Sequence, residues 1–171
     1  MMKIAGIQRV SLIDYPGRIG ATVFTQGCNF RCGYCHNAEL VCPDRFGPLI
    51  EEADIFAFLR KRTGKLEAVT VTGGEPTIQD GLVRFLGALK DLGYLVKVDT
   101  NGSNPLVLEE LIERRLADYI AMDIKGPMEK YGPIASVSVD TSRILKSIDL
   151  IVTSGIDHEF RTTVVRSQLD A

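Results

Sequence analysis

Residues 21–37 read ATVFTQGCNFRCGYCHN, and the first six of them have the character of a β-strand. Residues 21–26 are rich in β-branched and aromatic side chains, which favour strands. Three of the chain's four cysteines follow at spacings of four and three, namely Cys28, Cys32 and Cys35. The fourth, Cys42, lies seven residues beyond the last of them. The stretch therefore predicts a strand that ends in a loop rich in soft metal ligands.

The composition predicts one well-buried domain. The chain has 171 residues, of which 45% are hydrophobic and 25% charged, which is enough for a single core without disorder. A net charge of -2 and a pI near 5.7 disfavour a nucleic-acid binder. The sequence has no signal peptide and no apolar run of about 18 residues, so we expect no membrane contact and a cytoplasmic location. Thiols stay reduced in the cytoplasm, and the cysteines therefore indicate a metal or catalytic site rather than disulfides.

Helical and extended patterns alternate along the rest of the chain. Helices with one apolar face are predicted over residues 51–62, 82–92, 105–116 and 141–153. The last of these helices is expected to bury Ile144, Leu145, Ile148 and Ile151. Asn104, directly before Pro105, is expected to cap the third helix.

Apolar strands are predicted between these helices and after the last one. They cover residues 68–71, 95–98, 119–124 and 159–165. Repeated strand–helix units imply a parallel sheet with right-handed crossovers. From the pattern alone, the sheet could be open or curled into a barrel.

Four unusual motifs lie at or just beyond the ends of successive strands. They are the cysteine loop, GGEP at 73–76, DTNG at 99–102 and MDIK at 122–125. In parallel α/β folds the carboxyl ends of the strands share one edge, where ligands bind. The four motifs therefore predict one common site.

The residues alone leave three interpretations of the cysteines. Their spacing also fits the buried stripe of a helix, although Gly27, Asn29 and Gly33 make a helix unfavourable there. Zinc bound by all four cysteines would form a closed structural site. A four-iron cluster held by only three cysteines would leave one iron open for a ligand.

The motifs together resemble those of the radical S-adenosylmethionine superfamily. The resemblance rests on C-x3-C-x2-C with an aromatic residue before the last cysteine, followed by GGEP at the end of the next strand. TQGCNFRCGYCHN with DTNG and MDIK is similar to the activating enzymes of glycyl-radical enzymes. The opening KIAGIQRVSLIDYPGRI, residues 3–19, most resembles activators of anaerobic ribonucleoside-triphosphate reductase, which are related to pyruvate formate-lyase activating enzymes.

This resemblance implies a fold as well as an activity. It implies a single radical SAM domain over residues 1–171, built as a partial (β/α)6-type barrel with outer helices. The barrel of the family usually has six strand–helix units, and the sequence supplies about five, so we expect the last unit to be lacking. An open sheet would then expose an edge that needs covering.

The chemistry implied by the resemblance centres on a 4Fe-4S cluster held by Cys28, Cys32 and Cys35. S-adenosylmethionine would chelate the open iron through its amino and carboxylate groups. One electron would cleave it to methionine and a 5′-deoxyadenosyl radical, which takes hydrogen from a glycine of the partner enzyme. The implied partner is anaerobic ribonucleotide reductase, and the implied electron donor is of the flavodoxin or ferredoxin type.

Several residues near the cysteines receive cofactor-binding roles from the same resemblance. Tyr34 and His36 are expected beside the adenine, the histidine mainly through its backbone. Gly73 and Gly74 allow close approach of a ligand to the backbone, and with Glu75 they are expected to receive the amino group of S-adenosylmethionine. A carboxylate beside an apolar strand, such as that of the glutamate, also needs a partner.

Charged and hydroxyl side chains on the later strands complete the expected site. Asp99, Thr100 and Asp123 offer oxygen ligands to a hard cation, and the resemblance implies a monovalent cation there, with Asp123 also near the cofactor. Lys125 would neutralise the cofactor carboxylate or, alternatively, lie solvated on the surface. Arg161 lies in an apolar strand and needs a carboxylate partner, for which the resemblance favours the cofactor.

Two other functions stay compatible with the sequence. A radical SAM enzyme that acts on a small molecule would share the core motifs, because function depends on the site rather than the fold. A non-enzymatic module would bind zinc through all four cysteines. Cys42 has no place in the three-cysteine motif, so we interpret it as a spare thiol, with a zinc or second-cluster ligand as the alternative.

Overall fold

The computed structural model describes residues 1–166, which form one six-stranded sheet with helices packed against it. The strands pair in chain order, with β1 antiparallel to β2 and every later pair parallel. Their bounds are β1 (Ile4–Ser11), β2 (Gly20–Thr25), β3 (Ala68–Gly73), β4 (Leu95–Thr100), β5 (Tyr119–Asp123) and β6 (Asp157–Arg161). The predicted parallel sheet is thus confirmed for β2 to β6. The first strand was missed because most of its side chains are at least partly exposed, so it lacks the apolar run of a buried strand.

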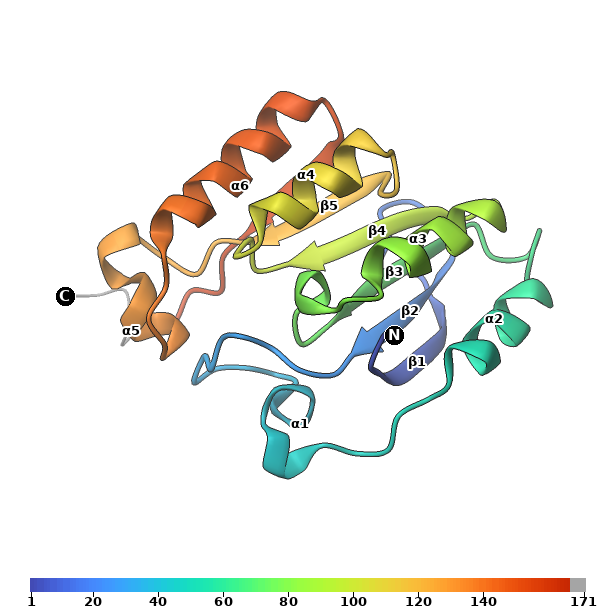
Figure 1. Ribbon diagram of the computed structural model, residues 1–171, viewed down its shortest axis with the longest axis horizontal. Coiled ribbons are helices and arrows are strands. Elements are labelled where there is room, and N and C mark those ends of the chain that lie inside the picture. Colours follow the sequence, from blue (N-terminus) through green and yellow to red (C-terminus); the bar gives the residue numbers. More distant parts are fainter. Residues whose placement is uncertain (167–171) are drawn as a thin grey trace.

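Six α-helices connect the strands. They are α1 (Ala38–Val41), α2 (Glu52–Arg60), α3 (Leu82–Asp91), α4 (Pro105–Glu113), α5 (Tyr131–Ala135) and α6 (Thr141–Ser154). The four longer helices were predicted within three residues at either end. The other two were missed because four or five residues are too few to show a helical period. Figure 1 shows α3 and α4 lying over the sheet, with α6 packed beside α4.

The two faces of the sheet differ in chemistry because side chains alternate along each strand. Val69, Val71, Val96 and Val98 are buried on the helix-covered face, against the apolar stripe of α3. Burial of each such side chain stabilises the fold by about 1.5–3 kcal/mol. The register aligns a second row, Thr22, Thr70, Lys97 and Tyr119, on the opposite face. That opposite face is therefore polar, and it carries the site described below.

Two predictions about individual elements are wrong, and a third is confirmed only in part. On α6, Leu145 is 53% exposed, whereas Ser147 is fully buried in its place. Asn104 is the N-cap residue of α4 and Pro105 follows it in the first turn, as predicted, but the Asn104 side chain makes no capping hydrogen bond and instead donates to the Thr77 carbonyl. The last strand was expected over 159–165, but β6 ends at Arg161, and Val164 is 75% exposed. A high β-propensity does not extend a strand where nothing packs against it.

The carboxyl ends of the parallel strands point to one edge of the molecule. In Figure 1 the arrowheads of β2, β4 and β5 point toward the side where α5 lies. The loop that follows β2 runs along this edge before it returns to α1. No helix within the described part of the chain combines the length and the apolar character needed to cross a membrane.

Candidate active site

A cavity of about 240 Å³ opens at the carboxyl ends of the strands. It collects residues from the loop after β2, from the ends of β3, β4 and β5, and from β6. Every site residue predicted from the sequence lines it: Cys28, Cys32, Tyr34, Cys35, His36, Gly73, Gly74, Glu75, Asp99, Thr100, Asp123, Lys125 and Arg161. The predicted gathering of the four motifs at one edge is therefore confirmed.

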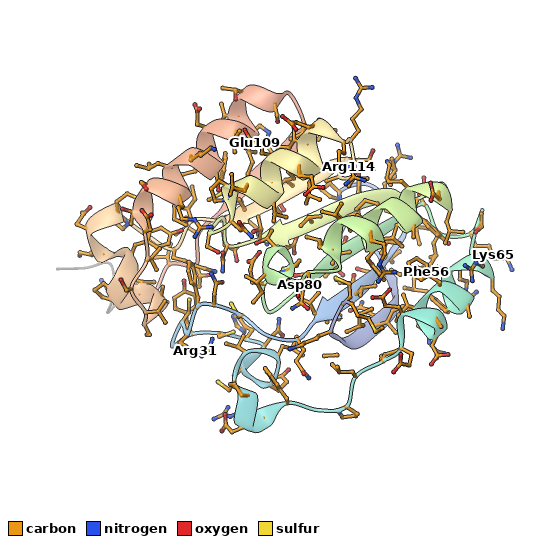
Figure 2. The ribbon with its side chains drawn as sticks, in the orientation of Figure 1. Arg31, Phe56, Lys65, Asp80, Glu109 and Arg114 are labelled. Carbon is orange, nitrogen blue, oxygen red and sulfur yellow. The ribbon has the colours of Figure 1, made fainter. Side chains whose placement is uncertain are left out.

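The cysteine loop is irregular rather than helical. No helix covers residues 28–35, so the interpretation of the cysteines as a buried helical stripe is wrong. Arg31 holds the loop in place, because its backbone N–H donates to the Ala135 carbonyl at 2.8 Å and its guanidinium donates to the Cys28 carbonyl at 2.6 Å. Figure 2 shows Arg31 on this loop. These bonds fix the backbone while all three thiols line the cavity.

Two of the thiols, those of Cys28 and Cys32, lie in surroundings that favour their protonated form. All four cysteines of the chain are free. Burial raises the pKa of Cys28 to about 11, and it also raises the pKa of Cys32. The Cys28 Sγ accepts hydrogen bonds from the Phe30 N–H at 3.3 Å and from the Asn101 side-chain amide at 3.9 Å. A bound metal centre would have to displace the protons and offset this burial, as thiolate sites do.

The placement of the cysteines bears on which metal centre they could hold. Cys42 follows α1 and does not line the cavity. Within residues 1–166, no three His, Cys, Asp or Glu side chains gather closely enough for a single metal ion. This arrangement does not fit a closed zinc site with four cysteines. Three thiols along one wall fit an iron–sulfur cluster, in which each ligand binds a different iron.

Glu75 is fully buried and joins the ends of β3 and β4. Its carboxylate accepts hydrogen bonds from the Thr77 N–H at 3.0 Å, the Thr77 hydroxyl at 2.6 Å, the Thr100 hydroxyl at 2.8 Å and the Asn101 N–H at 2.7 Å. Burial raises the pKa of Glu75, and these hydrogen bonds oppose that rise. The partners that this carboxylate was expected to need are therefore Thr77 in its own loop and Thr100 and Asn101 at the neighbouring strand end.

Gly73 and Gly74 are required by a close approach of backbone to backbone. Gly73 has a φ of +115°, and a Cβ on either glycine would collide with the backbone at Thr25 or Gly27. The Gly74 N–H donates to the Thr25 carbonyl at 2.9 Å, and the Glu75 N–H donates to the Gly27 carbonyl at 2.8 Å. These bonds attach the GGEP loop directly to the start of the cysteine loop.

Charged side chains of opposite sign alternate along the wall formed by β4, β5 and β6. The Arg161 Nε donates to Asp123 Oδ1 at 3.0 Å, and its Nη1 donates to Asp99 Oδ2 at 3.4 Å. Lys125 donates to Asp123 Oδ2 at 3.0 Å. The lysine side chain is only 15% exposed, so its interpretation as a solvated surface residue is wrong. The predicted need of Arg161 for carboxylate partners is met by two aspartates of the protein.

The pKa directions in this wall follow from burial and from the ion pairs. Burial raises the pKa of Asp99, although Arg161 and Lys97 act to lower it. Burial alone would lower the pKa of Lys125, but the carboxylate of Asp123 outweighs it and the pKa is raised. Lys125 and Arg161 therefore stay charged at neutral pH, each beside an aspartate that also lines the cavity.

Two polar atoms lie buried without hydrogen-bond partners among the described residues, the Tyr34 hydroxyl and Asp99 Oδ1. Both residues line the cavity. A buried polar atom without a partner is costly, and its presence beside a cavity indicates that a ligand supplies the missing contact. Burial also raises the pKa of Tyr34, which keeps its hydroxyl protonated as a donor.

Two functional residues were missed by the sequence analysis. Asn101 donates to Asn29 Oδ1 at 2.9 Å and accepts from the Ser103 N–H at 2.9 Å, so it joins the cysteine loop to the end of β4. Lys97 is 3% exposed in the middle of β4. Its signal was the one that identified Arg161, a single charge inside an apolar strand.

The fold and the site define a class of protein, namely an α/β enzyme that holds an iron–sulfur cofactor at the carboxyl ends of its parallel strands. The model of the Radical SAM superfamily matches residues 22–170, and the chain therefore belongs to this superfamily. The superfamily uses a 4Fe-4S cluster together with S-adenosylmethionine.

Individual relatives and solved structures show which proteins of this superfamily the chain is similar to. A Methanocaldococcus jannaschii protein named "putative glycyl-radical enzyme activating enzyme" is 38% identical over 98% of this chain and 70% of its own length. A 7-carboxy-7-deazaguanine synthase of Clostridium acetobutylicum is 36% identical over 65% of the chain and 49% of its own length. Streptococcus suis SuiB, solved bound to S-adenosylmethionine, has the same fold, with a TM-score of 0.61 at 17% identity over 84% of this chain and 32% of that one. The chain thus spans only part of the length of each of these proteins.

Proposed function

We propose that this chain activates a glycyl-radical enzyme. The proposal is carried by one observation above all: three free cysteines and a wall of charged side chains line the same cavity at the carboxyl ends of the strands. The similarity to the Methanocaldococcus protein over nearly the whole chain supports it. When bound, the cluster and S-adenosylmethionine supply a 5′-deoxyadenosyl radical that abstracts hydrogen from a glycine of the partner. The chain's own residues bind and orient the two cofactors and exclude water from them.

In this proposal, Cys28, Cys32 and Cys35 hold the cluster and leave one iron open. Tyr34 and His36 lie on the adenine side of the cofactor. The unpartnered Tyr34 hydroxyl supports this role, because its burial leaves it a donor without an acceptor. Cys42 is a spare thiol outside the cavity.

The opposite wall receives the amino acid part of S-adenosylmethionine. Gly73 and Gly74 present their backbone to its amino group, and Glu75 fixes the shape of that loop through its four hydrogen bonds. Lys125 and Arg161 supply positive charge for its carboxylate. Because both cations already pair with aspartates, the cofactor would share them rather than displace them.

A monovalent cation is proposed beside the carboxylate of S-adenosylmethionine. Its oxygen ligands would come from Asp99, Thr100 and Asp123, which line the same part of the cavity. Asp99 Oδ1 accepts no hydrogen bond among the described residues, and its one charged neighbour there, Lys97 Nζ, lies 3.5 Å away, so the cation would share this oxygen with the lysine. The Thr100 hydroxyl donates to Glu75 and accepts from the Gly102 N–H at 3.1 Å, which leaves one lone pair of its oxygen for a cation.

The wider setting of the reaction follows from the same resemblance. We propose that residues 1–171 belong to a single radical SAM domain that acts in the cytoplasm. The proposed partner is anaerobic ribonucleotide reductase, and the proposed electron donor is a flavodoxin or ferredoxin. The N-terminal segment KIAGIQRVSLIDYPGRI supports this choice among glycyl-radical enzymes.

Reductive cleavage of S-adenosylmethionine tests the proposal at the level of the cofactor. The chain is reconstituted with iron and sulfide without oxygen, reduced, and assayed for 5′-deoxyadenosine by chromatography. We expect product from the wild type and from Cys42→Ala, and none from Cys32→Ala. Equal loss in both variants, or stoichiometric zinc binding without a cluster, would contradict the proposed assignment of the cysteines.

A second candidate is a radical SAM enzyme that acts on a small molecule. The similarity to 7-carboxy-7-deazaguanine synthase supports this second candidate function. The two functions differ in which molecule gives up the hydrogen atom, a glycine of a partner enzyme or a small-molecule substrate. Deuterium from a labelled partner glycine would appear in 5′-deoxyadenosine only if the chain is an activating enzyme.

A further inference from the structure

Lys97 is a buried cation directly beneath the cavity. It precedes Asp99 by two residues in β4, so both side chains lie on the polar face of the sheet, one layer apart. Its side chain is only 4% exposed. A buried ammonium group is costly unless it is paired and hydrogen-bonded, and a lysine in this place therefore calls for an explanation.

The Lys97 ammonium group is held by three different segments. Its Nζ donates to the Asp14 carbonyl at 2.6 Å and to Glu159 Oε1 at 3.3 Å, and it lies 5.4 Å from the centre of the Tyr119 ring. The Tyr15 ring packs against Tyr119 at 5.9 Å between ring centroids. These contacts hold the ammonium group inside the sheet and away from solvent.

The remaining contact of Lys97 points toward the cavity. Its Nζ lies 3.5 Å from Asp99 Oδ1, while Arg161 approaches the other oxygen of the same carboxylate at 3.4 Å. Lys97 and Arg161 therefore share one carboxylate from opposite sides. Of the two cations, only the arginine lines the cavity.

We infer that Lys97 is a positioning residue of the S-adenosylmethionine site, which acts by balancing the charge of Asp99 from below. Without that charge, Asp99 would draw the Arg161 guanidinium more fully onto itself and away from the cofactor carboxylate. The inference rests on the proposed placement of the cofactor in the cavity. It assigns no chemical step to Lys97, which does not line the cavity.

The test is a double-mutant cycle in which S-adenosylmethionine affinity is measured for the reconstituted, reduced protein. The readout is the cofactor concentration that half-converts the electron paramagnetic resonance spectrum of the cluster. We expect Lys97→Met to weaken binding roughly tenfold, as for directly coupled side chains. In an Asp99→Asn background the same substitution should change affinity by no more than about twofold, because the charge it balances is gone.

Lys90→Met is the matched control. Lys90 pairs with Asp118 at 2.6 Å, is also partly buried, and lies on α3 outside the cavity. The Lys90→Met substitution should leave the affinity for S-adenosylmethionine unchanged. Wild-type affinity in Lys97→Met, or equal losses with and without Asp99→Asn, would overturn the inference. Absence of cofactor binding by the wild type would instead overturn the proposed function.

The cycle stays decisive if Lys97→Met alone does not fold. The variant that carries both substitutions removes the pair together and leaves no new unpaired charge on Asp99. Its affinity is then compared directly with that of Asp99→Asn. Affinities equal to within about twofold support a role through Asp99, and a larger further loss contradicts it.

Discussion

The side-chain amide of Asn101 lies 3.9 Å from the Cys28 Sγ and is held there by Asn29. A donor to a cluster thiolate stabilises the reduced, more negative state and so raises the reduction potential. Asn101→Ala should therefore lower the potential of the cluster by about 20–60 mV, the equivalent of one hydrogen bond of about 0.5–1.5 kcal/mol.

Redox titration followed by electron paramagnetic resonance measures this shift. Asn104→Ala is a suitable control, because Asn104 belongs to the same segment but its side chain bonds to the Thr77 carbonyl and to Arg143 rather than to a cysteine. An unchanged potential in Asn101→Ala would show that the contact has no electrostatic effect on the cluster.

Removal of the Glu75 carboxylate should destabilise the protein. Glu75→Ala would leave the buried N–H groups of Thr77 and Asn101 without acceptors. The free energy of unfolding should fall by about 3 kcal/mol, since each unsatisfied buried group costs about 1–3 kcal/mol. Urea denaturation followed by circular dichroism measures this change. Glu110→Ala, which removes an exposed ion pair with Arg114, should cost no more than about 0.5 kcal/mol. Similar losses in both variants would refute the role of Glu75 as a link between strands.

At the scale of single residues, the sequence predicted which side chains line the cavity but not what each one contacts. Glu75 was expected at the cofactor, yet its hydrogen bonds go to Thr77, Thr100 and Asn101. Lys97 was missed although Arg161 was found. The partners that make its burial tolerable, Asp14 and Glu159, come from distant segments, and no local pattern reveals them.

At the scale of elements, α6 supports the end of β4 through one buried hydroxyl. The Ser147 hydroxyl donates to the Gly102 carbonyl at 2.7 Å. Ser147→Ala should lower the free energy of unfolding by about 1–3 kcal/mol, because that carbonyl would lose its buried donor. Thermal unfolding measures the loss.

The control for Ser147 lies in the same helix. Ser142→Ala changes an exposed serine in the first turn, and it should alter the unfolding temperature much less. An equal effect of the two substitutions would mean that the loss reflects helix propensity rather than the bond to Gly102.

The helices of this protein were predictable because an apolar stripe at helical spacing reports burial directly. Of the five residues predicted for the apolar stripe of α3, four are buried, namely Leu82, Phe85, Leu86 and Leu89, and the fifth, Leu92, is half-buried at the C-cap. On α6 the same rule predicted burial of Leu145 rather than Ser147. Hydrophobicity alone gives no sign that a serine is buried because it donates a hydrogen bond to a carbonyl. The edge strands β1 and β6 were missed or misplaced, since their side chains are mostly not buried.

At the scale of the whole molecule, the parallel sheet turns four separate motifs into one site. Each motif follows a different strand, and each is brought to the same cavity by the common direction of β2 to β5. That gathering could be predicted from the alternation of elements alone. The bonds that join the motifs could not, because Gly27, Glu75 and Asn101 meet only after the sheet has formed.

The activation of a glycyl-radical enzyme is the central claim, and the partner's glycyl radical is its most direct measure. The reconstituted chain is mixed without oxygen with S-adenosylmethionine, reduced flavodoxin and anaerobic ribonucleoside-triphosphate reductase, and the electron paramagnetic resonance spectrum is recorded. We predict a glycyl radical signal that is absent with Cys32→Ala and absent when the radical-bearing glycine of the reductase is replaced by alanine. A silent spectrum while 5′-deoxyadenosine accumulates would contradict the claim.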